Sequence, residues 1–368
     1  LEKNNAALES WEESPNIKFE EFTRAVSLGL FDYLRKSHSR GFVVSLSGGV
    51  DSAAVSVLVW VLTKLAIQDL GVAGFAKALG RPTSDFQDPA NVVAQLLTTV
   101  YQATRNSSEV TRDAAQSVAQ AIGATHHEWS VDDIVELYKS RVGEAIGREL
   151  EWKTDDIALQ NIQARVRSPG AWMLANLNGT LLLATSNRSE VAVGYATMDG
   201  DTSGGLSPIA GIDKAFLRKW TEWMETSGPV GLEPIPALAK VNRQAPTAEL
   251  RPSTSKQTDE DDLMPYEVLD KIERYAIRDK LMPLEVFQHL QSQCTTIPAT
   301  DLAKWTIKFF RLWCRNQWKR ERFAPSFHLD ESSLDPKTWC RFPILSGGYE
   351  YEIELLQKHV TETQLKKS

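Results

Sequence analysis

Short apolar runs alternate with helical patterns through the first half of the chain, and this alternation constrains the fold more than any other feature. Each run is brief and contains β-branched residues, as expected of buried parallel strands. Parallel strands need a crossover between them, and a helix usually supplies it. The sequence therefore predicts a doubly wound parallel α/β sheet with strands at 41–47, 95–104, 125–131 and 180–186.

Helical patterns fill the intervals between these strands. Apolar side chains recur at helical spacing in residues 17–38, and similar patterns occupy 52–66, 107–123 and 158–179. Pro169 should kink or restart the last of these helices, because proline cannot donate a backbone N–H to the carbonyl four residues earlier. Ligands of such sheets bind beyond the carboxyl ends of the strands, and we expect a functional site there.

Composition and charge narrow the class of protein. The 368-residue chain has a formal net charge of −7, which argues against extended binding to nucleic acid or anionic membranes. The N-terminus lacks a signal-peptide pattern, and the longest apolar run, "AAVSVLVWVL", is shorter than the ~20 residues of a membrane helix. Cys294, Cys314 and Cys340 are widely spaced and expected to be free thiols. We therefore expect a cytoplasmic protein with no nucleic-acid or membrane partner.

The stretch "SLSGGVDS" (45–52) joins the first strand to the next helix. Gly48 and Gly49 remove side chains where the backbone can approach a ligand, and the helix N-terminus offers N–H groups to an anion. The loop lacks the lysine of a Walker A motif and carries Asp51 instead. A phosphate there would need a bridging cation, and Mg²⁺ suits oxygen ligands. The alternative is a structural turn in which Asp51 or Ser52 caps the helix.

This loop resembles the nucleotide-binding loop of the ATP pyrophosphatase superfamily. Enzymes of that superfamily cleave ATP between its α- and β-phosphates and adenylate a substrate. Synthetases of NAD, GMP, asparagine and argininosuccinate belong to it, so the loop alone does not select the substrate. The resemblance implies ATP contacts from Ser45, Ser47, Gly48, Gly49, Asp51 and Ser52.

A second set of motifs narrows the choice. The stretch "LLLATSNRSEVAVGYATMDGDTSGGLSPIAGIDK" (181–214) resembles the long signature of NAD synthetases. Three further blocks resemble that family in the expected order, at 161–167, 244–252 and 257–270. The resemblance implies an adenine nucleotide alpha-hydrolase-like, Rossmann-like fold.

The resemblance covers most of the chain up to about residue 290. Residues 300–360 are similar to the C-terminal part of the glutamine-dependent form, which implies a synthetase domain at 1–290 and a C-terminal helical extension at 291–368. That form carries an N-terminal nitrilase-like glutaminase domain, for which this chain shows no counterpart, and the chain begins at Leu1 rather than Met. We therefore expect the synthetase portion of a longer glutamine-dependent enzyme.

The implied catalytic residues come from separate segments. Glu190 follows the fourth strand as Asp51 follows the first, so both should lie at the ligand-binding edge of the sheet. The resemblance makes these two carboxylates the magnesium ligands, and Lys214 the lysine that reaches the phosphates of ATP. Without the resemblance, Glu190 is interpreted as a helix-capping acid and Lys214 as a solvated lysine.

The two substrates have further implied contacts. Those to ATP outside the glycine loop are Arg105, Thr185, Lys214 and Thr247, the last in a proline-rich lid at 227–256. Those to deamido-NAD are Asn161, Arg165 and Asp201. Asp201 has an alternative role as an Asx-turn residue. Met198 and Asp199 depart from the ammonia-dependent pattern, which puts nicotinate contacts at 196–199 in doubt.

The implied reaction has two steps. The carboxylate of deamido-NAD attacks the α-phosphorus of ATP and expels pyrophosphate, and ammonia then attacks the adenylated carbonyl to give NAD and AMP. The resemblance implies Mg²⁺ as cofactor, a homodimer, and free ammonia as the nitrogen donor of this chain, with glutamine serving a longer parent. Two alternatives are another ATP pyrophosphatase amidotransferase, such as GMP synthetase, and a non-catalytic module that binds adenine nucleotides.

A basic stripe follows in residues 301–323, which are predicted to form a helix. Its members recur at helical spacing: Lys304, Lys308, Arg311, Arg315, Lys319 and Arg322. Basic and aromatic residues together are compatible with RNA binding or with an acidic subunit face. The net charge of −7 favours a packed helix with one solvated edge.

Overall fold

The computed structural model describes residues 8–86, 88, 91–244, 250, 259–344 and 346–365. The chain forms two compact units. The first comprises residues 1–183, 217–245 and 249–252, and the second comprises 184–216, 246–248 and 253–368. The predicted division into a synthetase domain (1–290) and a C-terminal extension (291–368) was based on family resemblance and not on packing. It stays a prediction.

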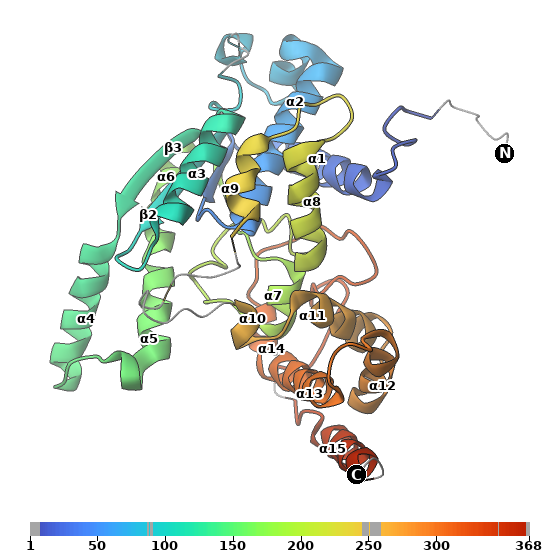
Figure 1. Ribbon diagram of the computed structural model, residues 1–368. Coiled ribbons are helices and arrows are strands. Elements are labelled where there is room, and N and C mark those ends of the chain that lie inside the picture. The colour runs from blue at the N-terminus through green and yellow to red at the C-terminus, as the bar shows by residue number, and fades with distance from the viewer. Residues whose placement is uncertain are drawn as a thin grey trace. The chain divides into compact units, whose positions relative to one another are not determined.

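The first unit is built on a parallel sheet. Its described strands are β1 (Phe42–Ser45), β2 (Leu97–Ala103), β3 (Thr125–Ser130) and β4 (Leu181–Leu183). They are ordered β3-β2-β1-β4, and every neighbouring pair is parallel (Figure 1). Each strand lies within a predicted range, so the predicted α/β class is confirmed. The strand order reverses between β1 and β4, and ligands of such sheets bind at this switch point.

Helices cover both faces of the sheet. The described helices of this unit are α1 (Ile17–Ser37), α2 (Val50–Ala78), η1 (Thr83–Phe86), α3 (Glu109–Ile122), α4 (Asp132–Ile146), α5 (Trp152–Arg165), α6 (Arg167–Asn178), η2 (Pro236–Leu238), α9 (Ala239–Asn242), and α8 (Lys214–Thr226), which begins in the second unit, and α2, α3 and α6 contact the strands. The β1–β2 and β2–β3 crossovers run in one direction across the sheet, and the β3–β4 crossover runs back in the other. Because such crossovers are right-handed, α2 and α3 lie on one face and α6 on the other. Val43, Val100 and Leu182 pack against Ala171 and Ala175 of α6.

Helix α2 is long and apolar enough to cross a membrane by length and composition. However, 72% of its most apolar window is buried, and the helix packs against α1 and β1. Gly71, with φ 65°, interrupts its helical geometry. The apolar composition therefore fits a core helix of the first unit.

The predicted interruption near Pro169 is confirmed, but it falls earlier in the chain. Helix α5 ends at Arg165, and α6 begins at Arg167 after Val166. Pro169 lies in the first turn of α6, where its missing N–H has no intrahelical partner to lose.

Helices α4 and α5 form a hairpin that projects beyond the sheet (Figure 1). Helix α4 has one buried side chain, Val135, and leaves an apolar stripe exposed at helical spacing. The stripe consists of Ile134, Leu137, Tyr138, Val142 and Ile146. Two members of this stripe, Tyr138 and Val142, also line the groove between α4 and α5.

The second unit is helical in its described residues. Its elements are α7 (Arg188–Val193), α10 (Asp259–Asp262), α11 (Tyr266–Glu273), the π-helical turn η3 (Arg274–Arg278), α12 (Pro283–Gln293), α13 (Ala299–Arg315), α14 (Gln317–Arg320) and α15 (Glu350–Leu365). One apolar cluster joins α7 to α11, α12, α13 and α15. The C-terminal helices therefore share a core with the helix that carries Glu190.

The basic stripe does not lie on one continuous helix, because the backbone leaves helical geometry at Asn316 between α13 and α14. The predicted single helix is therefore wrong in this respect. Lys308 donates to the main-chain carbonyls of Asp262 and Leu263, and Arg322 pairs with Asp199. These contacts support the interpretation of the stripe as a packed edge.

Candidate active site

The two glycines of the loop after β1 differ in what surrounds them. Gly48 has φ +85°, and a Cβ there would lie 2.1 Å from the carbonyl oxygen of Thr111. Packing of the loop on α3 therefore requires glycine at this position. Gly49 has φ −89°, and a Cβ there would meet only Ser47 Oγ, at 3.5 Å. Packing within the unit does not explain Gly49.

Helix α2 begins directly after this loop. Its N-cap is Gly49, so the alternative in which Asp51 or Ser52 is the N-cap is wrong. Ser52 Oγ instead accepts from the N–H of Ser47 at 3.1 Å and donates to the carbonyl of Gly49 at 3.2 Å. The hydroxyl thus fixes the loop, while Asp51 lies in the first turn of the helix. The N-terminus of such a long helix offers free N–H groups and a positive dipole end, which favour the binding of an anion.

The segment predicted as a lid makes several contacts with the first unit, and two of them involve the loop after β1 and helix α5. Gln244 Nε2 donates to the carbonyl of Gly48 at 3.5 Å. The carbonyl of Leu250 accepts from Gln163 Nε2 on α5 at 2.6 Å. Gln244 therefore contacts the glycine loop, and Leu250 contacts α5. Thr247, predicted to contact ATP, lies outside the described residues.

A groove of about 770 Å³ lies between α4 and α5. Asn161 and Arg165, the predicted deamido-NAD contacts, line it together with Tyr138, Ile157 and Ile162. This volume falls within the usual range of small-molecule sites, about 300–1,000 Å³. The structure therefore places both predicted residues at one concave surface.

Arg105 follows β2, as predicted. Its side chain is 60% exposed and pairs with Asp132 at 3.5 Å and with Glu136 at 3.2 Å, both on α4. Its contact with ATP stays a prediction.

In the second unit, Glu190, which is partly buried, pairs with Lys214, which is buried. Glu190 Oε1 lies 3.4 Å from Lys214 Nζ, and their side chains are 14% and 4% exposed. Asn187 is the N-cap of α7, because its side chain accepts from the N–H of Glu190 at 3.0 Å. The interpretation of Lys214 as a solvated lysine is therefore wrong, whereas the position of Glu190 in the first turn of α7 remains compatible with a helix-capping acid.

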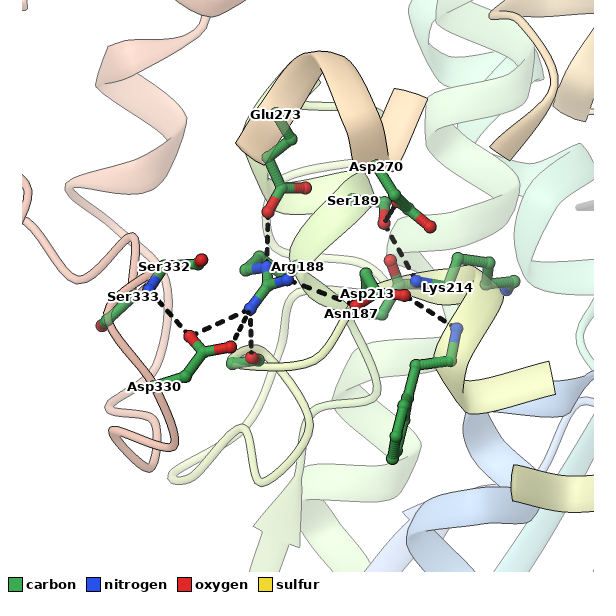
Figure 2. Close-up of polar contacts among 12 residues, drawn as sticks. Asn187, Arg188, Ser189, Asp213, Lys214, Asp270, Glu273, Asp330, Ser332 and Ser333 are labelled. Atoms are coloured by element: carbon green, nitrogen blue, oxygen red, sulfur yellow. Dashed lines mark hydrogen bonds and ion pairs between the residues drawn. The ribbon is translucent and has the colours of Figure 1, made fainter. Parts of the chain in front are cut away.

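Arg188, in the first turn of α7, is surrounded by three carboxylates (Figure 2). Its guanidinium lies 3.3 Å from Asp213 and 3.1 Å from Asp330, and it forms an ion pair with Glu273. Burial opposes the charge of Arg188, but Glu273 and the other two carboxylates raise the pKa of the guanidinium. Burial raises the pKa of Glu273 to about 7, although Arg188 acts in the opposite direction. Since Asp213 precedes Lys214, this network joins the starts of α7 and α8.

Ser189 and Asp270 make a second connection between these helix starts (Figure 2). The N–H of Lys214 donates to Ser189 Oγ at 2.9 Å, and that hydroxyl donates to Asp270 at 2.5 Å. The N–H of Ala215 donates to the second oxygen of Asp270 at 3.1 Å. Burial, with the nearby charge of Asp213, raises the pKa of Asp270 well above its ordinary value.

The loop after α7 contains Asp201, whose Oδ1 accepts from the N–H of Thr197 at 2.7 Å. This donor lies four residues before Asp201, whereas an Asx-turn would use the N–H two residues after it, so the bond does not correspond to the predicted Asx-turn. The contact with nicotinate stays a prediction. Met198 is buried in the core of the second unit. Asp199, with φ 64°, pairs with Arg322 through both carboxylate oxygens, at 2.8 and 3.0 Å. Met198 and Asp199, the two residues that differ from the ammonia-dependent pattern, therefore both make contacts within the second unit.

The predicted site residues divide between the two units. The first unit holds Ser45, Ser47, Gly48, Gly49, Asp51, Ser52, Arg105, Asn161 and Arg165, and the second holds Thr185, Glu190, Asp201 and Lys214. Ser45 Oγ donates to Gln102 Oε1 at 3.4 Å, at the carboxyl end of β1. Because Asp51 and Glu190 belong to different units, their joint binding of Mg²⁺ stays a prediction.

The donor chemistry of these two residues fits the implied metal. Asp51 and Glu190 each offer carboxylate oxygens, the atoms that Mg²⁺ prefers, from the first turn of a helix. Among the described residues, no group of three or more histidine, cysteine or acidic side chains could hold a metal. A metal bound by two carboxylates would complete its coordination with substrate oxygens and water, as Mg²⁺ commonly does.

The network around Arg188 was missed in the sequence, although Arg188 stands inside the signature at 181–214. The one feature of the local sequence that could have indicated the network is a basic residue close to Thr185 and Glu190, two predicted site residues. Its partners Glu273 and Asp330 follow far along the chain, so no spacing pattern indicates them.

Comparisons with known proteins agree with the motifs. A family model described as NAD synthase matches residues 22–311. A glutamine-dependent NAD(+) synthetase of Oryza sativa subsp. indica is 33% identical over 339 residues, which cover 85% of this chain and 45% of that protein. One from Aquifex aeolicus (strain VF5) is 33% identical over 339 residues, which cover 92% and 50%.

A solved structure agrees as well. The crystal structure of a glutamine-dependent NAD(+) synthetase from Cytophaga hutchinsonii has 44% identity and a TM-score of 0.79, over 92% of this chain and 56% of that chain. The chain spans about half the length of the curated relatives that it matches. Because the NAD synthase model matches well over half of its residues, the chain belongs to the NAD synthase family.

Proposed function

We propose that this chain catalyses the ATP-dependent amidation of deamido-NAD to NAD, with release of AMP and pyrophosphate. The observation that carries the proposal is the largely buried Glu190–Lys214 pair, which two polar networks hold at the starts of α7 and α8. In such a pair, the ammonium group could bind phosphate oxygens, and the carboxylate could bind the metal ion that accompanies a polyphosphate. Membership of the NAD synthase family supports this choice of substrate.

In the first step, the nicotinate carboxylate attacks the α-phosphorus of ATP, and pyrophosphate leaves. The N–H groups at the start of α2 would hold phosphate oxygens, and Lys214 would neutralise charge on the leaving pyrophosphate. Mg²⁺ held by Asp51 and Glu190 would neutralise further phosphate charge when bound. Positioning and charge neutralisation suffice here, because the substrate carboxylate is itself the nucleophile.

In the second step, ammonia attacks the adenylated carbonyl and AMP leaves. Adenylation is needed because a free carboxylate is a poor electrophile and would have to expel oxide. This chain would use free ammonia, whereas a longer parent would obtain it from glutamine. The names of the relatives, glutamine-dependent NAD(+) synthetases, support that role for a longer parent.

The proposal extends to assembly and location. The exposed apolar stripe of α4 supports a homodimer formed through the α4–α5 hairpin. The three cysteines are buried free thiols, which supports a reducing cytoplasmic location.

The decisive assay supplies deamido-NAD, ATP, Mg²⁺ and ammonium and measures both NAD and pyrophosphate. Lys214→Met and Glu190→Gln should each lower kcat by about 10²–10³. Lys219→Met and Glu222→Gln are matched controls, because both side chains are exposed on α8. ATP binding without pyrophosphate release would instead identify a non-catalytic nucleotide-binding module. Turnover with glutamine alone would contradict the use of free ammonia.

A further inference from the structure

Helix α7 carries Glu190 but is only six residues long. Helices this short are not stable alone, so contacts with other segments must fix its position. Both of its ends are bonded to the C-terminal part of the second unit, through Asn316, Lys319, Arg320 and Asp330. We call these four residues the α7 clamp.

At the start of α7, the clamp acts through Asp330. Its two carboxylate oxygens lie 3.2 and 3.1 Å from Arg188 Nη1 (Figure 2). The N–H of Ser332 donates to Asp330 at 2.8 Å and orients the carboxylate. The same Arg188 nitrogen donates to the carbonyl of Gly211 at 2.8 Å. Asp330 therefore fixes the guanidinium that joins α7 to the segment before Lys214.

At the end of α7, three side chains of the clamp donate to main-chain carbonyls. Asn316 donates to Val193 at 2.6 Å, and Arg320 donates to Ala192 at 2.6 Å. Lys319 donates to Gly194 at 2.7 Å and to Ala196 at 2.8 Å. Helix C-termini leave such carbonyls without intrahelical partners, and cations there also complement the helix dipole.

The close approach at this end explains one glycine. Gly194, with φ +65°, is the C-cap of α7, and a Cβ there would lie 2.4 Å from the Cβ of Asn316. The helix end and the clamp are therefore packed with no room for a side chain between them.

We propose that the four clamp residues are positioning residues for Glu190. They hold α7 at both ends, so that the Glu190 carboxylate stays 3.4 Å from Lys214 Nζ. The C-terminal segment would thereby support catalysis without touching a substrate. Because a misplacement of about 1 Å can cost about 10²-fold in rate, a loosened α7 should lower kcat. This inference rests on the proposed function.

The test compares Asp330→Asn with Glu331→Gln. Glu331 is the adjacent carboxylate, 66% exposed, and pairs with Arg278 at 3.7 Å. Asp330→Asn should lower kcat about tenfold or more, with little change in the KM for deamido-NAD, and should speed hydrogen–deuterium exchange in residues 188–196. Glu331→Gln should change neither. Equal kcat values and equal exchange rates in the two variants would overturn the inference.

A double variant shows whether Asp330 acts through Glu190. If it does, Asp330→Asn combined with Glu190→Gln should be no slower than Glu190→Gln alone, whereas multiplied losses would contradict this route. Should Asp330→Asn fail to fold, Lys319→Met against Lys304→Met, an exposed lysine of α13, repeats the comparison. A wild-type chain that makes no NAD would refute the proposed function instead, and the exchange measurement would still decide whether the clamp holds α7.

Discussion

Gly48 and Gly49 are adjacent, but their surroundings predict different consequences of adding a methyl group. Gly48→Ala should lower the free energy of unfolding by at least about 1–2 kcal/mol, because its φ is positive and its Cβ would clash with the carbonyl of Thr111. Gly49→Ala should leave stability within about 1 kcal/mol of the wild type, since its φ is negative. Urea denaturation measures both values.

Gly49→Ala, which should change stability little, should instead affect the binding of ATP. Gly49→Ala should weaken ATP binding about tenfold, equivalent to about 1.4 kcal/mol, if a phosphate approaches this backbone closely. Isothermal titration calorimetry on the folded variant measures the change. Unchanged affinity in Gly49→Ala would show that ATP does not approach the loop here.

Glu273 predicts a pH dependence of stability. The folded protein keeps its proton up to about pH 7, whereas the ordinary pKa is 4.5. Between these values the unfolded chain binds fewer protons, so the free energy of unfolding falls as pH rises. The contribution of the Glu273 carboxyl to the free energy of unfolding is complete below pH 4.5, and it is lost as the pH rises through 7. Glu273→Gln should therefore lose less stability between pH 5 and pH 8 than the wild type, by on the order of 3 kcal/mol.

Chemical denaturation at several pH values tests this prediction. Asp270, whose pKa burial also raises, acts in the same direction, so the slope should be reduced rather than abolished. Glu331→Gln, an exposed carboxylate on the surface of the second unit, is the control and should follow the wild type. Identical slopes for Glu273→Gln and the wild type would exclude the buried carboxyl as a source of the dependence.

At the scale of elements, the basic side chains of α13 predict a contrast in stability. Lys308→Met should cost about 1.5–3 kcal/mol, because Lys308 donates to the carbonyls of Asp262 and Leu263. Lys304→Met, at an exposed position of the same helix, should stay within about 0.5 kcal/mol of the wild type. Thermal unfolding compares them. Equal effects, together with loss of RNA binding in both variants, would restore the RNA interpretation of the stripe.

Local patterns predicted the four strands and several of the helices, because strand and helix periodicity is a property of neighbouring residues. The four strands lie inside their predicted ranges for this reason. Helix α4 and the continuation of α2 to Ala78 were not predicted. The restart between α5 and α6 was placed near Pro169, yet it lies at Val166, since proline is tolerated in a first turn. No glycine or proline lies at the break at Asn316, and the helical spacing of the basic residues continues across it. The sequence therefore predicted one continuous helix.

The candidate site was only partly predictable. The glycine loop, Glu190 and Lys214 stand in recognisable local motifs, and the structure pairs the last two. Arg188 gains its carboxylates from segments up to 142 residues away. Such contacts depend on the folded path of the chain and leave no spacing signal, so the support of α7 emerges only from the structure.

At the scale of the whole molecule, the open question is how an exposed apolar stripe is covered. Helix α4 exposes Leu137, Tyr138 and Val142 among its stripe residues, at 57%, 52% and 45%. We predict that a second copy of the chain covers this stripe in a two-fold dimer, the commonest symmetric assembly.

Leu137→Lys should therefore convert a dimer to a monomer while leaving the fold intact, because the side chain is already exposed in the single chain. A lysine charge brought into an apolar contact would cost more than the contact gains, since a buried unpaired charge is strongly unfavourable. Val110→Lys is the matched control, an equally exposed apolar residue on α3, at 60%. Sedimentation velocity over a range of concentrations should give two chain masses for the wild type and Val110→Lys, and one for Leu137→Lys. A wild type that sediments as a monomer throughout, or a Leu137→Lys variant that still dimerises, would place the partner of α4 elsewhere.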